Sequence, residues 1–204
     1  MCFYSAVSTE AAKIEHRFKA KFKHLNEFKP ANLLNGFAHP KTPVITHRNN
    51  QEIELFEWGL LPAWAKDRSL QKNSLNARIE TLHEKPMFRQ VLQNRCLVIA
   101  TGFYEWQWLD EKGKNKQRYF LRLPDQEIYA FAGLWNEWVD QNTGEIVGTY
   151  TIITTEAQGI MREIHNSKMR MPFTLLPKQE QTWLQGNEVF VETLNWIAEE
   201  NGEW

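Results

Sequence analysis

The feature that most constrains the fold is a run of four strand-like segments in the middle of the chain. They cover residues 96–108, 118–123, 127–139 and 145–154 and are rich in aromatic and β-branched side chains. The connections between them contain Gly, Pro, Asp or Asn, which favour tight turns. Because consecutive strands joined by short turns pair antiparallel, the sequence predicts a curved antiparallel β-sheet or partial barrel.

Short helices are predicted to flank this sheet. Apolar periodicity, a proline in a first turn and a capping box indicate helices at residues 10–22, from Pro86 onward, directly after residues 155–158, at 177–184 and at 188–198. The helix after the capping box is expected to deliver His165 at its end. A further strand is expected at residues 52–58, with irregular chain before Pro43. The length of 204 residues fits one α+β domain over residues 1–204, whose tail, residues 199–204, frays.

Charge and cysteine content narrow the class of protein. The formal net charge of −1 gives no basic excess, so any DNA-binding surface has to be local. The basic segments at residues 13–29 and 112–122 are either such surfaces or solvated faces. Two cysteines without a CxxC or HExxH motif predict reduced thiols, no metal and no cofactor. Without a signal peptide or membrane span, the expected location is cytoplasmic, or nucleoid-associated if the source is a bacterium.

Cys2 stands out by its position directly after the initiator methionine. Aminopeptidases remove Met1 before a small residue, which would leave Cys2 with a free α-amine beside its thiol. The amine (pKa about 8) and the thiol (pKa about 8.5) are both nucleophilic near neutral pH. Together they can trap an aldehyde, first as a Schiff base and then as a five-membered thiazolidine. The alternative is that cysteine at this position is incidental.

Three other positions carry polar groups suited to catalysis. Alternation places Glu105 on the strand face opposite Tyr104 and Trp106, where aromatic surroundings would raise its pKa. A solvent-facing acid or an ion pair is the alternative. Asn76 and Arg78 share a bend, where they would orient an amine and a phosphate or else only brace the loop. His165 is either an acid or base, or a structural histidine.

Taken together, these pieces resemble the SRAP family of abasic-site-processing, SOS response-associated peptidase-like proteins. The matching blocks follow one another in order at Met1-Cys2, 58–67, 76–81, 95–98, 102–106, 131–135, 151–157, His165 and Arg170-Met171-Pro172. Each block alone is weak, but their order after an N-terminal Met-Cys is highly specific.

The resemblance implies a protein, most simply a monomer, that binds single-stranded DNA containing an abasic site and crosslinks to the opened sugar. Carried over by motif, Cys2 is the nucleophile, Asn76 positions the reacting terminus, Glu105 transfers protons, and His165 assists ring opening and protonates the departing oxygen. The resemblance also implies a DNA path lined by Arg78, Trp64, Arg170 and, more weakly, Pro40. Lyase and thiol peptidase activities are possible within the same family.

Two departures and two rival readings accompany this resemblance. Many family members continue as Cys-Gly-Arg, whereas Phe3 and Tyr4 follow here, so an aromatic replaces a phosphate-binding arginine. The spacing between His165 and Arg170 is also longer than the family's usual His-x-Arg-Met-Pro. One rival hypothesis is a cysteine peptidase acting on its own N-terminus, and the other is a module that binds single-stranded or modified DNA without chemistry.

Overall fold

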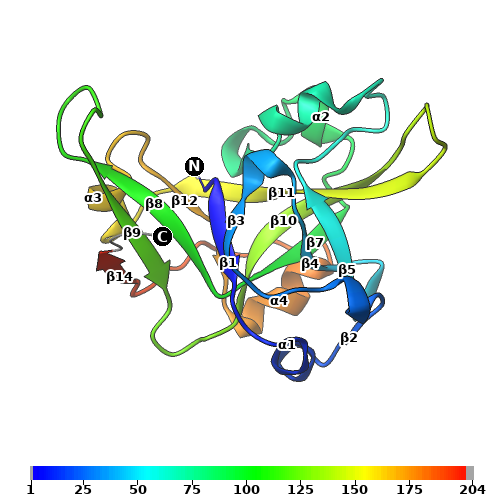
Figure 1. The fold of residues 1–204 in the computed structure, drawn as a ribbon, viewed down its shortest axis with the longest axis horizontal. Coiled ribbons are helices and arrows are strands. Elements are labelled where there is room, and N and C mark those ends of the chain that lie inside the picture. The colour runs from blue at the N-terminus through cyan, green and yellow to red at the C-terminus, as the bar shows by residue number, and fades with distance from the viewer. Residues whose placement is uncertain (1, 201–204) are drawn as a thin grey trace.

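The computed structural model describes residues 2–200, which form an α+β domain built on two sheets (Figure 1). The helices are α1 (Ala11–Phe18), α2 (Pro86–Arg89), α3 (Met161–Ile164) and α4 (Pro177–Leu184). The strands are β1 (Tyr4–Val7), β2 (Lys21–Phe22), β3 (Ala31–Asn35), β4 (Lys41–Thr46), β5 (Asn49–Trp58), β6 (Asn76–Arg78), β7 (Arg95–Ala100), β8 (Gly102–Trp108), β9 (Lys116–Arg122), β10 (Tyr129–Val139), β11 (Ile146–Glu156), β12 (Arg170–Pro172), β13 (Thr174–Leu175) and β14 (Ile197–Glu200).

The larger sheet curves until it meets itself. Its strands follow the order β12-β11-β10-β7-β4-β5-β2, and β11 also pairs in parallel with β5 where Thr149 and Tyr150 face Glu57 and Trp58. The smaller sheet has the order β14-β9-β8-β1-β3 and is antiparallel throughout. The predicted α+β class with a curved sheet or partial barrel and short helices is therefore confirmed.

The strand predicted over residues 96–108 is divided between the two sheets. The chain leaves β7 at Ala100 and enters β8 at Gly102, and Thr101 lies at the break. The Thr101 amide donates to the carbonyl of Ala6, and its hydroxyl accepts from the amide of Ser8. Thr101 therefore ties the junction of the two sheets to β1.

The first predicted helix is shorter than residues 10–22. It ends at Lys19, which has a left-handed backbone (φ 53°), and the chain turns there into β2, although Ile14 is buried as expected. The segment before Pro43, predicted to be irregular, contains β3 and the start of β4. Two-residue and five-residue strands at sheet edges carry too little periodicity to be read from sequence.

The C-terminal third departs further from prediction. Thr155 and Glu156 belong to β11 rather than to a capping box, and α3 begins only after Gly159. α4 is confirmed, but the helix predicted at residues 188–198 is absent: residues 188–196 have no regular secondary structure, and β14 follows them. Glu199 and Glu200 are paired in β14 rather than frayed, and the rest of the predicted tail, residues 201–204, lies outside the described residues.

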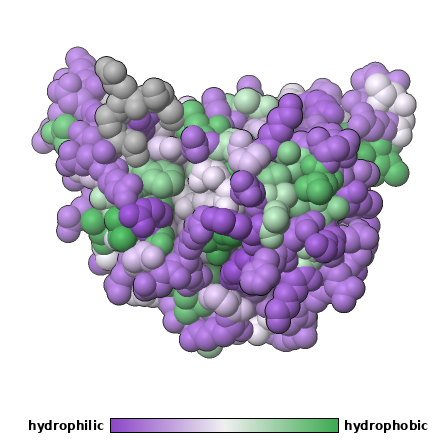
Figure 2. Space-filling view, turned by 60° about the horizontal axis from the view of Figure 1, so that its bottom comes forward, coloured by the Kyte–Doolittle hydropathy of each residue, from purple (hydrophilic) through white to green (hydrophobic). Residues whose placement is uncertain are grey.

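The apolar core forms two main clusters, one of which carries Cys2. That cluster lies between the sheets and includes Trp58, Phe103 and Phe131. The buried indole of Trp58 donates to the carbonyl of Leu75 at 2.8 Å, which fixes the chain just before β6. Figure 2 shows one face of the surface as mostly hydrophilic, with apolar residues in small separate patches. Within residues 2–200 no helix is long and apolar enough to span a membrane.

Candidate active site

Cys2 lies two residues before the start of β1, the strand held between β3 and β8. In the chain that still carries a residue before it, Cys2 has 0% of its surface exposed. Its thiol contacts the carbonyl of Tyr4 at 3.6 Å. Burial, and next the negative charge of Glu105, raise the pKa of the Cys2 thiol far above its usual value. The sulfur is therefore held as a neutral thiol, and its use as a nucleophile requires a nearby group that takes the proton.

Asn76 holds the backbone of Cys2 from the opposite side. β6 pairs in parallel with β11, which places Asn76 beside Ile152. The Asn76 side-chain amide donates from Nδ2 to the carbonyl oxygen of Cys2 at 2.8 Å. Its Oδ1 atom is buried and accepts no hydrogen bond from the part of the chain that the structure describes. Asn76 therefore orients Cys2 and retains one acceptor for a further donor.

Glu105 is an internal carboxyl, not a solvent-facing one. The alternation of β8 is as predicted: Glu105 shares the buried face with Phe103, while Tyr104 and Trp106 are partly exposed on the other. Only 4% of Glu105 is exposed, and this burial raises its pKa to about 7. Both protonation states are therefore populated near neutral pH, as proton transfer requires.

His165 follows α3 and is 5% exposed. Its Nδ1 atom lies 2.5 Å from the carbonyl oxygen of Arg170 and 3.9 Å from a carboxylate oxygen of Glu105. Burial, reinforced by the charges of Arg170 and Lys168, lowers the pKa of His165 to about 4. The imidazole is thus neutral at pH 7, and the carbonyl acceptor requires the ring proton to be on Nδ1.

Two surface pockets flank these four residues. Pocket A, of about 380 Å³, is lined by Phe3, Tyr4, Glu105, Trp106, Trp108, Lys116, His165, Ser167 and Lys168. Pocket B, of about 430 Å³, is lined by Trp64, Asn73, Asn76, Arg78, Thr81, Lys85, Pro86, Met87 and Phe88. Each combines aromatic and cationic side chains, a composition suited to stacked bases and phosphates. Cys2, which touches Asn76 and is coupled to Glu105, lies between them.

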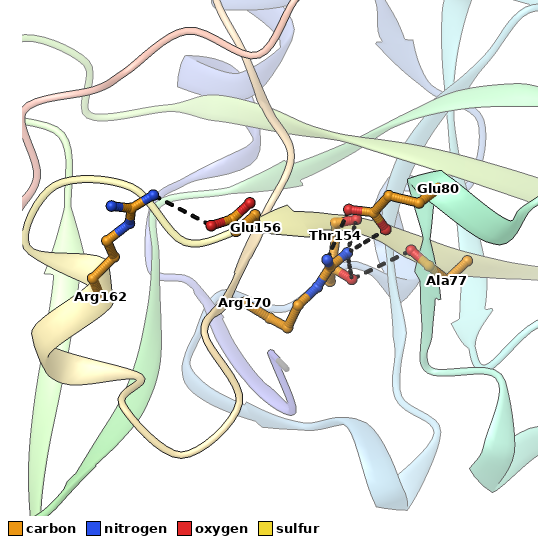
Figure 3. Close-up of polar contacts among 6 residues, drawn as sticks. All are labelled: Ala77, Glu80, Thr154, Glu156, Arg162 and Arg170. Atoms are coloured by element: carbon orange, nitrogen blue, oxygen red, sulfur yellow. Dashed lines mark hydrogen bonds and ion pairs between the residues drawn. The ribbon is translucent and has the colours of Figure 1, made fainter.

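The predicted DNA-contacting residues do not all share this surface. Trp64, 49% exposed, and Arg78 line pocket B. Pro40 is half-buried, lines neither pocket, and accepts a hydrogen bond from the amide of Trp58. Arg170 is buried, and its guanidinium is bound to Glu80 and Thr154 (Figure 3). This internal position does not favour the direct phosphate contact predicted for Arg170.

Several pocket A residues were not assigned to the site from sequence, although Lys116 belongs to the basic segment at residues 112–122 and Tyr4 was noted as a departure from the family pattern. Lys116 pairs with Trp108 across the β8–β9 hairpin, with its ammonium 5.4 Å from the indole centroid. Tyr4 contacts Trp106 at 5.0 Å between ring centroids. Counting outward from the predicted turn at residues 110–113 pairs Trp108 with Asn115, one residue short of the observed partner, because the loop is one residue longer than predicted. Lys168 has no such signal, because it reaches the pocket through the irregular loop after His165.

No metal centre accompanies the site in residues 2–200: no group of three or more His, Cys, Asp or Glu side chains is placed to hold an ion. The fold and this site define an α+β protein with a cysteine-centred candidate active site. The chain belongs to the SRAP family, since the family model described as SOS response associated peptidase (SRAP) matches residues 1–202.

Individual relatives agree with this family. The chain is 41% identical to the abasic site processing protein YoqW of Bacillus subtilis (strain 168) over 142 residues, which are 69% of this chain and 61% of YoqW. It is 32% identical over 160 residues to the abasic site processing protein HMCES of Xenopus tropicalis, covering 67% of this chain and 46% of that protein. The matched region thus spans less than two thirds of these relatives.

Solved structures share the fold. A protein from Bacteroides thetaiotaomicron superimposes with a TM-score of 0.84 at 33% identity, covering 92% of this chain and 83% of that one. A protein from Bordetella bronchiseptica gives the same TM-score, 0.84, at 19% identity over 99% of this chain and 100% of its own, which shows the fold alone.

Proposed function

We propose that this chain processes abasic sites in single-stranded DNA by linking Cys2 covalently to the opened sugar. The observation that carries the proposal is the grouping of Asn76, Glu105 and His165 around the one residue that becomes a 1,2-aminothiol when Met1 is removed. The relatives named as abasic site processing proteins support the same substrate.

The proposed chemistry begins with the sugar of the abasic site in its ring-opened aldehyde form. The α-amine of Cys2 attacks the aldehyde carbon, and the resulting carbinolamine loses its hydroxyl as water to give an imine. The thiol then adds to the imine carbon and its proton passes to the nitrogen, which closes a thiazolidine. The net change is one aldehyde and one aminothiol converted to one thiazolidine and one water.

Each neighbouring group has a distinct part in these steps. Asn76 holds the carbonyl of Cys2, and its second amide atom is available to accept from the new amine. Glu105, with a pKa of about 7, takes the proton from amine or thiol and returns it to the departing hydroxyl. His165 is neutral with its ring proton on Nδ1, so its Nε2 atom accepts the hydroxyl proton of the sugar during ring opening and, once protonated, returns a proton to the departing oxygen.

The DNA strand in this proposal crosses the site from pocket A to pocket B. Trp106 and Trp64 would stack bases on either side of the lesion, while Arg78 and Lys116 would contact phosphates. A lesion seated between the pockets would be shielded from nucleases by the protein itself. A monomer acting in the cytoplasm is sufficient for this activity.

A second candidate is an autopeptidase in which Cys2 attacks the peptide bond before it. The charge interaction of Glu105 with the thiol, with His165 3.9 Å from Glu105, favours this candidate, because a buried thiol needs a base. Under autoproteolysis, Glu105→Ala and His165→Ala proteins would retain residues ahead of Cys2. Removal by a cellular aminopeptidase would leave Cys2 first in every variant, and intact mass distinguishes the two.

The decisive experiment uses protein whose free Cys2 terminus is confirmed by intact mass. It is incubated with a single-stranded oligonucleotide that carries one abasic site, then separated on a denaturing gel beside Cys2→Ala and an undamaged oligonucleotide. A denaturation-resistant band that requires both the lesion and Cys2 is expected. If no such band forms, the crosslinking proposal fails. Retained affinity for the oligonucleotide would then support the binding-only hypothesis.

A further inference from the structure

The two Nη atoms of Arg170 make several internal contacts (Figure 3). Its Nη1 and Nη2 atoms donate to the two carboxylate oxygens of Glu80 at 2.8 and 3.0 Å. Nη2 also donates to the carbonyl of Thr154 at 2.6 Å. Partial burial opposes ionisation of Glu80, yet the hydrogen bonds and charge of Arg170 hold the Glu80 pKa below its usual value. The two side chains therefore form a bidentate ion pair anchored to β11.

The same residue is joined to His165 through its backbone. The carbonyl oxygen of Arg170 accepts the Nδ1 proton of His165, so its place determines which ring nitrogen is protonated. The loop between them is tight: Met169 has a left-handed backbone (φ 52°), a conformation that costs a methionine energy. The ion pair of Arg170 holds the far end of this strained loop in place.

The ion pair is also connected to β6, the strand that carries Asn76. Thr154, which Arg170 contacts, faces Arg78 in the β6–β11 pairing, and its hydroxyl donates to the carbonyl of Ala77 at 3.4 Å. Glu80 follows β6 by two residues. One guanidinium thus joins the strand that carries Asn76, the strand beside it and the loop that carries His165.

We infer that Arg170 and Glu80 are positioning residues, whose ion pair keeps His165 and Asn76 in place on the two sides of Cys2. This inference rests on the proposed function for its kinetic consequence, but not for its effect on the His165 ring. Arg170 acts through these two residues rather than on the DNA strand.

The test compares Glu80→Gln, Arg170→Gln and Arg170→Lys with wild type. Glu80 has a half-exposed side chain, so Glu80→Gln is expected to fold even if Arg170→Gln does not. Matched controls come from the neighbouring pair Arg162 and Glu156, which is exposed and 3.3 Å apart, as Arg162→Gln and Glu156→Gln. Three readouts are needed: the crosslinking rate at saturating abasic oligonucleotide, the Kd for an undamaged oligonucleotide, and the His165 tautomer by nitrogen-15 NMR.

The positioning role predicts a rate roughly ten- to a hundredfold lower in Arg170→Gln, with unchanged Kd, because small displacements of reacting groups are costly. Glu80→Gln should lower the crosslinking rate less than Arg170→Gln does. Arg170→Lys should recover only part of the rate, because an ammonium keeps the positive charge but cannot make the bidentate contact. The Nδ1–H form of His165 should give way to mixed tautomers in Arg170→Gln. The two control variants should match wild type in all three readouts.

Two outcomes would overturn the inference. If Arg170 contacts phosphate directly, Arg170→Gln weakens Kd and lowers its salt dependence, whereas Glu80→Gln frees the guanidinium and tightens Kd. If the pair only stabilises the fold, the variants melt earlier but keep the wild-type rate and tautomer well below their melting temperature. Should wild type itself fail to crosslink, the proposed function falls, and the tautomer measurement still decides the positioning role.

Discussion

Burial acts in opposite directions on the two titratable side chains nearest Cys2. It raises the pKa of Glu105 to about 7 and lowers that of His165 to about 4, so burial favours the uncharged form of each. At neutral pH the pair therefore holds at most one net charge, in a site with little water. Glu105 can therefore take up or release a proton near neutral pH while His165 stays neutral, which suits a reaction that must both remove and return protons.

The raised pKa of Glu105 predicts a pH-dependent gain in stability for Glu105→Gln. Between its ordinary pKa of 4.5 and the folded value of about 7, the folded state holds a proton that the unfolded state has lost. Wild-type stability should therefore fall as pH rises through this window, by about 3 kcal/mol in total. Chemical unfolding at pH 4.5 and pH 8 should show Glu105→Gln more stable than wild type only at pH 8. An equal difference at both pH values would contradict the assignment, and exposed Glu145→Gln is the control.

The contact from Asn76 to Cys2 predicts a kinetic effect. Asn76→Ala removes one hydrogen bond worth about 1 kcal/mol, which corresponds to a rate about fivefold lower or more. Asn76→Asp should be slower still, because a carboxylate would face the carbonyl oxygen of Cys2 without a donor. Single-turnover crosslinking measures both, with the exposed Asn50→Ala as control. A wild-type rate in Asn76→Ala would remove Asn76 from the mechanism.

At the scale of elements, local sequence patterns predicted the long central strands and α4. They failed where tertiary contacts determine the secondary structure. Nothing local marks Thr101 as the point where one continuous strand-like run passes from one sheet to the other. The segment at residues 188–196 has helical periodicity, but it forms no helix: Val189, Val191, Leu194 and Trp196 pack against the core, while Phe190 is exposed.

The candidate site was predictable to the extent that its residues belong to motifs. Glu105 was placed on the correct strand face by alternation alone, whereas the grouping with Asn76 and His165 came from the family resemblance. The ion pair of Glu80 and Arg170 could not be predicted, because its partners are 90 residues apart and meet only when β12 pairs with β11.

The start of β8 offers a prediction about how this strand is held. A Cβ added at Gly102 would lie 2.0 Å from Cζ of Phe120, whose ring covers the glycine from β9. Gly102→Ala should therefore destabilise the protein by about 1–3 kcal/mol. The double variant Gly102→Ala/Phe120→Ala should lose less unfolding free energy than the sum of the losses in the two single variants, because removal of the ring also removes the clash. Additive costs in thermal unfolding would show that the ring does not pack on Gly102.

At the scale of the whole molecule, positive charge is balanced by negative charge, and the candidate site relies on a few local cations. The net charge is −1, yet pockets A and B together present Arg78, Lys85, Lys116 and Lys168. Attraction of a polyanion then depends on these few side chains and not on the overall field of the protein.

This distribution predicts a shallow salt dependence of DNA binding. If these four cations each neutralise one phosphate of a single strand, the plot of log K against log salt concentration should have a slope of about −3. Replacing Lys116 or Lys85 by Gln should reduce the slope by about 0.7 each. Fluorescence anisotropy with an undamaged oligonucleotide measures this. An unchanged slope in both variants would place the strand elsewhere.

The position of Cys2 near β1 also determines when the nascent chain can bury its N-terminal segment. β1 completes its pairing only when β8 has been made, so about 108 residues must leave the ribosome first. At about 5–20 residues per second this takes roughly 5 to 20 s, during which the N-terminus is open to an aminopeptidase. In the folded chain Cys2 has no exposed surface. If an aminopeptidase exposes the proposed nucleophile, its best opportunity is therefore during synthesis, before β1 pairs with β8.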